Sequence, residues 1–191
     1  MILGMGAARG TLAFVRTTVE HEINAATDNP LIFPAASGTT SYRALSGGNF
    51  HGQPVAMAAD FLAIAVAEVA GLGERHVNRL LNPALSGLPD FLTQSKGLDS
   101  GLMVAQHTAA ALVGENKALS HPGVVDSISV SADKEDHVSM GPVSVRKLAD
   151  ICRNAEAVVA IELLCAAQAL EFSKPKHAGT GVRAAYRHIR D

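Results

Sequence analysis

Residues 53–81 read QPVAMAADFLAIAVAEVAGLGERHVNRLL, and apolar side chains fall on nearly every face of this stretch until Arg75. After Arg75 the stretch becomes amphipathic. At about 1.5 Å per residue a helix of this length spans about 42 Å, and it has more than twice the about 11–12 residues of a typical helix. A helix that is apolar on all sides needs neighbours on all sides. The stretch therefore predicts a bundle of long helices that surrounds it.

Three further stretches have helical periodicity, at about residues 2–26, 100–119 and 142–172. In the first, Leu12, Val15, Val19 and Ile23 recur at three- and four-residue spacing. Asp99 or Ser100 is a suitable cap for the second, and Pro142 stands in the first turn of the third, where proline is favoured. No segment has sustained strand alternation. The predicted fold class is therefore all-α.

The four predicted helices shield one another only partly, so we expect long antiparallel helices that form a bundle continuing across subunits or into other sequence. Helices of this length pack antiparallel at about 20° by default. The helical-bundle domain is expected to span residues 1–172. Residues 173–191, which are rich in lysine, proline and glycine, are expected to form a loose C-terminal tail.

Composition excludes several classes of function. The 191 residues are 48% hydrophobic and 18% charged, which is typical of an ordered domain. A net charge of −2 provides no basic face for nucleic acid or for an anionic membrane. Charged residues also interrupt both of the most apolar stretches, which argues against a membrane span; they are Asp60, Glu68, Glu156 and Glu162.

The sequence also indicates a compartment. The first residues lack the basic region of a signal peptide. Cys152 and Cys165 lie in one predicted helix, about 20 Å apart along its axis, which is too far for a disulfide within that helix. They are interpreted as buried thiols in a reducing compartment, so we expect a cytoplasmic protein.

Between the first two predicted helices, residues 46–52 read SGGNFHG. The glycines allow left-handed backbone angles and close approach, while Asn49, Phe50 and His51 bring an amide, a ring and an imidazole to one tight loop. Loops held by rigid helices often carry binding and catalytic groups. A simple connector is the alternative interpretation of the same residues.

A second polar segment, residues 131–141, reads SADKEDHVSMG just before the last long helix. Its carboxylates, lysine and histidine suit general acid–base chemistry, and they equally suit a charged loop that caps the helix. His51, His121 and His137 lie in three loops but lack metal-ligand spacing, so no metal site is expected. No Gly-x-Ser-x-Gly elbow occurs, which argues against a serine nucleophile.

Five motifs, in this order, resemble those of histidine ammonia-lyase and the other aromatic amino acid lyases. They are DNPL at residues 28–31, SGGNFHG at 46–52, SGLMVAQ at 100–106, ENKAL at 115–119 and EDHVSMG at 135–141. The match covers most of residues 1–172. Several long motifs in the right order with compatible spacing make the resemblance highly specific. It indicates the C-terminal portion of such an enzyme.

The resemblance implies elimination of ammonia from an aromatic amino acid, here L-histidine, to give urocanate. The electrophile in the family is a methylidene-imidazolone group, which forms from an internal Ala-Ser-Gly and captures the substrate amine. Phe50 resembles the ring that lines the pocket against cofactor and substrate, and Glu135 resembles the catalytic and substrate-binding carboxylate that faces the substrate amine or imidazole. The resemblance also implies a homotetramer whose long helices form a central bundle.

The sequence departs from the family at several points. The family's Ala-Ser-Gly lies well upstream, whereas Ala36-Ser37-Gly38 lies in a connector and is interpreted as a chance tripeptide. The family usually has Asn-Gln where this chain has Asp133 and Lys134. The methylidene-imidazolone is therefore not expected to form in this chain, and the chain alone is expected to be inactive. The alternatives are a non-catalytic oligomerisation module or truncated paralogue, or part of a tyrosine or phenylalanine lyase or an aminomutase.

Overall fold

The computed structural model describes residues 2–35, 41–95, 97–173 and 178–191. Within them the chain is mainly helical, with one short hairpin, so the predicted all-α class is confirmed. The elements in chain order are α1 (Ile2–Ile23), β1 (Leu31–Pro34), β2 (Tyr42–Leu45), η1 (Asn49–His51), α2 (Gln53–Leu81), α3 (Pro83–Ser86), η2 (Asp90–Leu92), α4 (Met103–Leu119), η3 (Gly123–Val125), α5 (Gly141–Phe172) and α6 (Thr180–Arg190).

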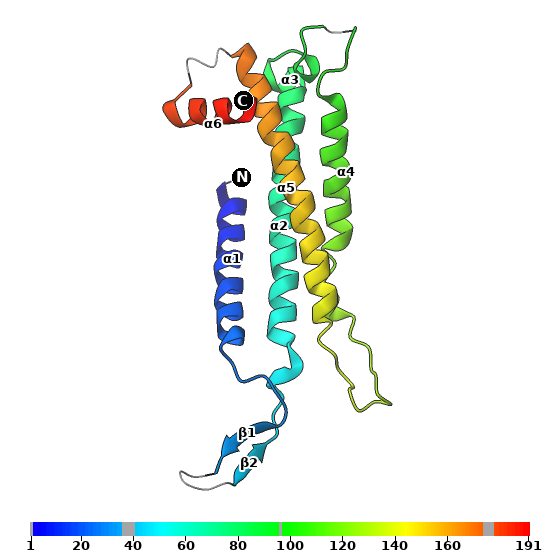
Figure 1. The fold of residues 1–191 in the computed structure, drawn as a ribbon. Coiled ribbons are helices and arrows are strands. Elements are labelled where there is room, and N and C mark those ends of the chain that lie inside the picture. Colours follow the sequence, from blue (N-terminus) through cyan, green and yellow to red (C-terminus); the bar gives the residue numbers. More distant parts are fainter. Residues whose placement is uncertain (1, 36–40, 96, 174–177) are drawn as a thin grey trace.

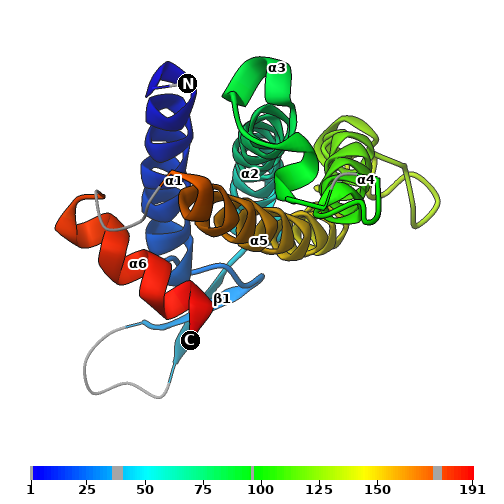
Figure 2. The same ribbon diagram turned by 90° about the horizontal axis from the view of Figure 1, so that it is seen from above.

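The long helices lie side by side, and each runs opposite to the long helix before it (Figure 1). Helices α2 and α5 pack against each other at the centre, with α1 and α4 on either side (Figure 2). Because α4 intervenes in the sequence, α2 and α5 run in the same direction. The loops that precede α2 and α5 therefore lie at one end of the molecule. We call this the loop end and define it as residues 46–52 and 120–140.

Small side chains dominate the core. Where α2, α4 and α5 meet, the buried cluster consists of Ala70, Ala109, Val113, Ala155 and Val158. A second cluster near the other end consists of Val77, Leu81, Leu92, Cys165 and Ala169. Alanine at a helix contact lets the two backbones approach closely. The two clusters therefore hold α2 against α5 at both places, and α4 against them at the first.

The starts of the central helices follow from glycine and proline. Gly52 has φ 76°, a left-handed conformation that suits glycine, and Pro54 stands in the first turn of α2. Helix α5 begins at Gly141 with Pro142 in its first turn, as the sequence predicts. The predicted end at residue 172 is also confirmed.

The predicted cap of α4 is wrong. The helix begins at Met103, and no side chain caps it. Asp99 instead accepts a hydrogen bond from the backbone N–H of Gly101 at 2.8 Å, in the turn before the helix. Gly101 has φ 49°, and a Cβ there would lie 2.4 Å from the carbonyl oxygen of Phe91. The turn with this close approach takes up residues 100–102, which the predicted helix of residues 100–119 includes.

The connector between α1 and α2 contains a hairpin that the sequence analysis did not predict. Helix α1 ends at Ile23 instead of residue 26, and β1 pairs antiparallel with β2 with Leu31 opposite Leu45. Most side chains of both strands are exposed. Strands without a buried face have no alternating apolar pattern, which explains why periodicity missed them.

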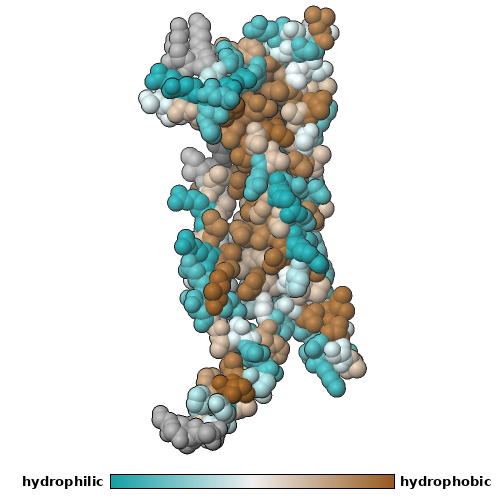
Figure 3. Space-filling view, in the orientation of Figure 1, coloured by the Kyte–Doolittle hydropathy of each residue, from teal (hydrophilic) through white to brown (hydrophobic). Residues whose placement is uncertain are grey.

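The segment expected to be a loose tail contains α6. Tyr186 donates a hydrogen bond to Glu171 of α5, and Arg190 donates one to Gln168 at 2.5 Å. Helix α6 packs near the end of α5 and is mainly hydrophilic (Figure 3).

Both cysteines are free thiols in α5. Burial, and secondarily the nearby carboxylate of Glu162, raises the pKa of the Cys165 thiol to about 11. Burial, with a smaller contribution from Glu156, also raises the pKa of Cys152.

By length and composition, residues Asn49–Leu81 would suffice to cross a membrane. The core helix of a globular protein meets the same two criteria. Helix α2 contacts the three other long helices, α1, α4 and α5, and buries two carboxylates, Asp60 and Glu74, each with a hydrogen-bond partner. These features favour a core helix.

Large apolar side chains also remain exposed along the helical body (Figure 3). On α1 and α2 they include Leu12, Phe14, Met57, Phe61 and Ile64. The rings of Phe14 and Phe61 meet edge to face with centroids 5.9 Å apart. The chain thus presents a broad apolar surface on the two helices.

Candidate functional site

The glycine-rich loop links the hairpin to α2. Asn49, Phe50 and His51 form the short helix η1, and Gly52 turns the chain into α2. The side chain of Asn29 accepts a hydrogen bond from the backbone N–H of Gly47 at 3.2 Å. This bond connects the DNPL motif to the glycine-rich loop, so two of the motifs found in the sequence lie together.

Phe50 projects from this loop with 56% of its surface exposed. The backbone shortly before it is open, because a Cβ added to Gly47 or Gly48 would meet no atom within 4 Å apart from the neighbouring residues. The loop therefore presents an exposed aromatic ring that follows a stretch of open backbone.

The second polar segment folds into a tight turn. Val130 and Glu135 pair as an isolated bridge, with Ser131, Ala132 and Asp133 between them in left-handed conformation. The Ser131 hydroxyl donates to the Glu135 carboxylate at 2.9 Å. The Ser129 hydroxyl donates to the Asp133 carboxylate at 2.6 Å. These bonds orient two exposed carboxylates at the tip of the turn.

The two polar segments meet at the loop end. The Nε2 atom of His51 lies 2.9 Å from the backbone carbonyl oxygen of His137. The two imidazole rings stack with centroids 5.6 Å apart and planes 4° apart. Gly52 lies against Ser139 as well. Phe50 and Glu135 therefore stand on adjacent segments, although 85 positions separate them in the sequence.

One hydrogen bond to α2 and one within the loop hold the segment between α4 and α5 in place. The buried Asp60 of α2 accepts a hydrogen bond from the backbone N–H of Val124. Nearer the turn, the Ser127 hydroxyl accepts one from the N–H of Val138. The segment is thus attached to α2 at Val124 and closed on itself at Val138, and neither bond was expected from the sequence.

His121 is separate from this histidine pair. Its Nε2 lies 3.0 Å from the carboxylate of Asp126, and its carbonyl oxygen accepts a hydrogen bond from Lys147. Among the described residues, no group of three or more histidine, cysteine or acidic side chains could hold a metal ion.

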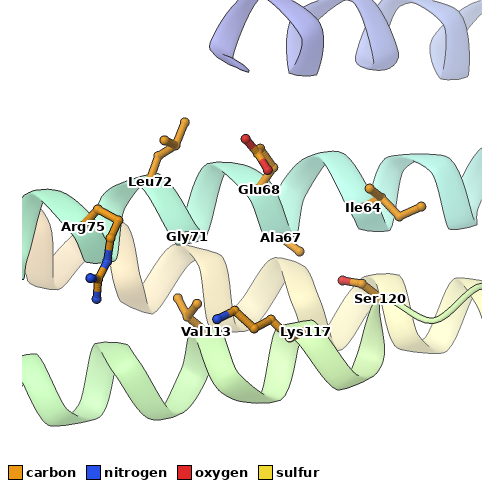
Figure 4. A pocket seen from close by; sticks show the side chains of 9 residues that line it. All are labelled: Ile64, Ala67, Glu68, Gly71, Leu72, Arg75, Val113, Lys117 and Ser120. Carbon is orange, nitrogen blue, oxygen red and sulfur yellow. The ribbon is translucent and has the colours of Figure 1, made fainter. Parts of the chain in front are cut away.

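A hollow of about 380 Å³ lies along the helical body, between α2 and α4. Arg75 points toward α4 and Glu68 points the opposite way, toward α1 (Figure 4). The remaining lining residues are Ile64, Ala67, Gly71, Leu72, Val113, Lys117 and Ser120. This hollow includes neither Phe50 nor Glu135, so it is distinct from the candidate site.

The roles expected for Phe50 and Glu135 stay predictions. Sequence reasoning missed His51 as a link between the segments, because its partner is a backbone carbonyl 86 positions away. The adjacency of His51 to Phe50 inside a glycine-rich loop was the available signal. Ala36-Ser37-Gly38 lies outside the described residues.

Comparisons with known proteins agree on a single family. The aromatic amino acid lyase family profile matches residues 3–191. The chain is 55% identical over 186 residues to the histidine ammonia-lyase of Symbiobacterium thermophilum, covering 97% of this chain and 36% of the relative. The chain therefore spans about a third of the length of the curated relatives it matches.

Solved structures share the fold. The crystal structure of histidine ammonia-lyase from Trypanosoma cruzi superposes with a TM-score of 0.90 at 45% identity, covering 97% of this chain and 36% of that one. Tyrosine aminomutase from Streptomyces globisporus superposes with a TM-score of 0.91 at 39% identity, covering 98% of this chain and 35% of that one. The same arrangement of helices thus occurs in proteins named for two different reactions.

Proposed function

The chain belongs to the aromatic amino acid lyase family, and on this premise we propose that it forms one side of the active site of an enzyme that converts L-histidine to urocanate and ammonia. The 55% identity to a histidine ammonia-lyase favours histidine as the substrate. The contact between His51 and His137 carries the proposal, because it joins the segments that bear Phe50 and Glu135. An exposed ring and an exposed carboxylate then face solvent from adjacent segments.

In this proposal each residue has one task. The ring of Phe50 packs against the flat face of the substrate imidazole and excludes water from it. The carboxylate of Glu135 binds the amine or the imidazole N–H, held in orientation by the Ser131 hydroxyl. Both groups position the substrate, and positioning alone contributes substantially to the rate of an enzymatic reaction.

The electrophile that the family resemblance implies is a methylidene-imidazolone, and such a group would supply an electrophilic centre for the substrate amine. The residues fit one side of a site for such a group, because Phe50 is exposed and space is open next to Gly47 and Gly48. We propose that the group is supplied by residues outside positions 1–191 and not by Ala36-Ser37-Gly38.

A homotetramer is part of the proposal. The exposed side chains on α1 and α2 supply a surface that a second copy would bury, as the family resemblance implies. A cytoplasmic location is proposed as well, consistent with two free thiols in the chain.

Complementation tests the function. The chain is produced alone, and also together with the part of the Symbiobacterium thermophilum relative that it does not match. Urocanate formation is followed by ultraviolet absorbance. We expect no urocanate from the chain alone and clear turnover from the pair. Clear turnover by the isolated chain would contradict the proposed origin of the electrophile.

One observation favours a second candidate, a non-catalytic assembly module. Asp133 and Lys134 replace the usual Asn-Gln beside Glu135, and Asp133 makes a bond to Ser129 that uses its carboxylate. A pair that assembles without any elimination would support this module. A pair that converts tyrosine to its β-isomer would instead identify an aminomutase.

A further inference from the structure

His51 occupies a position that links the two segments of the candidate site. It follows Phe50 directly in η1, and its Nε2 atom faces the carbonyl oxygen of His137, two residues after Glu135. A carbonyl oxygen only accepts hydrogen bonds, so the Nε2 atom must carry the proton. The partner therefore fixes which nitrogen donates, and the imidazole plane is fixed with it.

We propose that His51 is a positioning residue, whose Nε2–H bond to the carbonyl of His137 holds the loop of Phe50 against the turn of Glu135. The inference rests on the proposed function, because it concerns the separation of the two groups that would contact the substrate. His51 itself touches no reacting atom in this proposal. Its effect passes through the backbone on both sides of the bond.

The surrounding contacts explain why this one bond matters. The segment that bears Glu135 is fixed to α2 through the bond from Val124 to Asp60, and the bond from Val138 to Ser127 closes that segment on itself. The loop that bears Phe50 is fixed to the residues just before β1, through the hydrogen bond from Gly47 to Asn29. These anchors hold each segment separately. The bond from His51 crosses from one segment to the other.

The stacking of the His137 ring on the His51 ring is a second contact between the two segments. Substitutions can separate its effect from that of the hydrogen bond. His137 accepts the bond through its backbone, so replacing its side chain keeps the acceptor and removes the stack. Replacing His51 by leucine removes the donor. Replacing it by glutamine keeps an N–H donor near the position of Nε2.

Hydrogen–deuterium exchange on the full chain tests the bond without any need for activity. We expect the His51→Leu variant to raise amide exchange in residues 46–52 and 127–140, while His51→Gln and His137→Leu stay close to the wild type. Unchanged exchange in the His51→Leu variant would overturn the inference. Equal effects of His51→Leu and His137→Leu would also overturn it, because the stack would then be the link.

Kinetics of the complemented pair test the catalytic consequence. Displacement of a positioned group by about 1 Å can cost about 100-fold in rate, so we expect His51→Leu to lower kcat by about 10- to 100-fold. The His51→Gln variant should recover most of this loss. His121→Leu replaces a histidine at the same end that pairs with Asp126 instead, and serves as the matched control. Equal kcat for His51→Leu and His121→Leu would refute the positioning role.

The two tests distinguish this inference from the proposed function. If the wild-type pair makes no urocanate, the proposed function fails, and the exchange experiment still decides whether His51 links the segments. If the pair is active and His51→Leu keeps full kcat, the inference fails alone. Circular dichroism confirms that each variant is folded before either measurement.

Discussion

The carboxylate of Asp60, only 4% exposed within α2, accepts a hydrogen bond at 2.9 Å from the backbone N–H of Val124. This bond attaches the segment between α4 and α5 to the central helix. It also explains a charged residue in one of the most apolar stretches of the chain. The acidic residue that interrupts the hydrophobic pattern is a structural anchor.

Removing that acceptor should destabilise the fold. The Asp60→Ala variant leaves a partly buried N–H without a partner, which costs about 1–3 kcal/mol. Asp60→Asn keeps a carbonyl oxygen at the same place and should lose less. Thermal unfolding followed by circular dichroism measures both variants. Equal midpoints for Asp60→Ala and the wild type would show that the bond contributes nothing.

We expect the stability of the fold to depend on glycine at position 101. A Cβ there would lie 2.4 Å from the carbonyl oxygen of Phe91, and the left-handed backbone adds strain. Gly101→Ala should lower the free energy of unfolding by about 1–3 kcal/mol in urea titrations. Gly114→Ala is the matched control, since it lies exposed in α4 with no atom within 4 Å of the added Cβ. It should be neutral or stabilising by about 0.5–1 kcal/mol.

The carboxylate of Glu135 should be needed for turnover by the complemented pair. Glu135→Gln keeps the size and removes the charge that would hold the substrate amine or imidazole N–H in position, so we expect kcat to fall by about 100-fold. Asp136→Asn, the neighbouring exposed carboxylate, is the control and should retain most activity. Comparable losses for the two variants would mean that the total negative charge of the turn, and not the Glu135 carboxylate itself, supports the reaction.

The thiol of Cys165 should affect stability at high pH. Its pKa is raised from 9.0 to about 11 in the folded chain, so the folded state holds the proton more tightly than the unfolded state. Its contribution is fully present below pH 9 and is lost as the pH rises toward 11. The advantage of the wild type over Cys165→Ala in urea titrations should therefore shrink over that range. A constant difference from pH 8 to 11 would argue against a buried, protonated thiol.

Assembly should depend on the exposed rings of α1 and α2. Light scattering of the chain at micromolar concentration should give the mass of a tetramer. Phe61→Arg places a charge where Phe14 and Phe61 meet, and it should reduce the mass. Tyr42→Arg, which alters an exposed hairpin residue, serves as the comparison. A compact monomer in the wild type would contradict the proposed tetramer.

The sequence predicted the long helices well, because burial imposes a helical period on them. The limits of α5 and the proline in its first turn followed from that period and from proline chemistry. The hairpin did not follow, since the side chains of Tyr42–Leu45 are exposed and a strand without a buried face leaves little hydrophobic pattern. Helix α6 does have apolar residues at helical spacing, at Val182, Tyr186 and Ile189, and the lysine, proline and glycine of this segment drew attention away from them.

The candidate site was predictable only in part. Phe50 and Glu135 follow from motifs and stay predictions as site residues, whereas the contact between His51 and His137 depends on where α2 and α5 place their preceding loops. The expected antiparallel packing gives the directions of the two helices but not how the loops before them fold against each other. A side chain that bonds to a distant backbone carbonyl leaves no signature in residue types.

The shared direction of α2 and α5 has an electrostatic consequence. A helix carries about half a positive charge at its N-terminus, and both central helices begin at the loop end, at Gln53 and Gly141. Helices α1 and α4 end there, at Ile23 and Leu119, so the negative charge of their C-termini offsets this charge across the end as a whole. A field that favours anions is therefore confined to the first turns of α2 and α5.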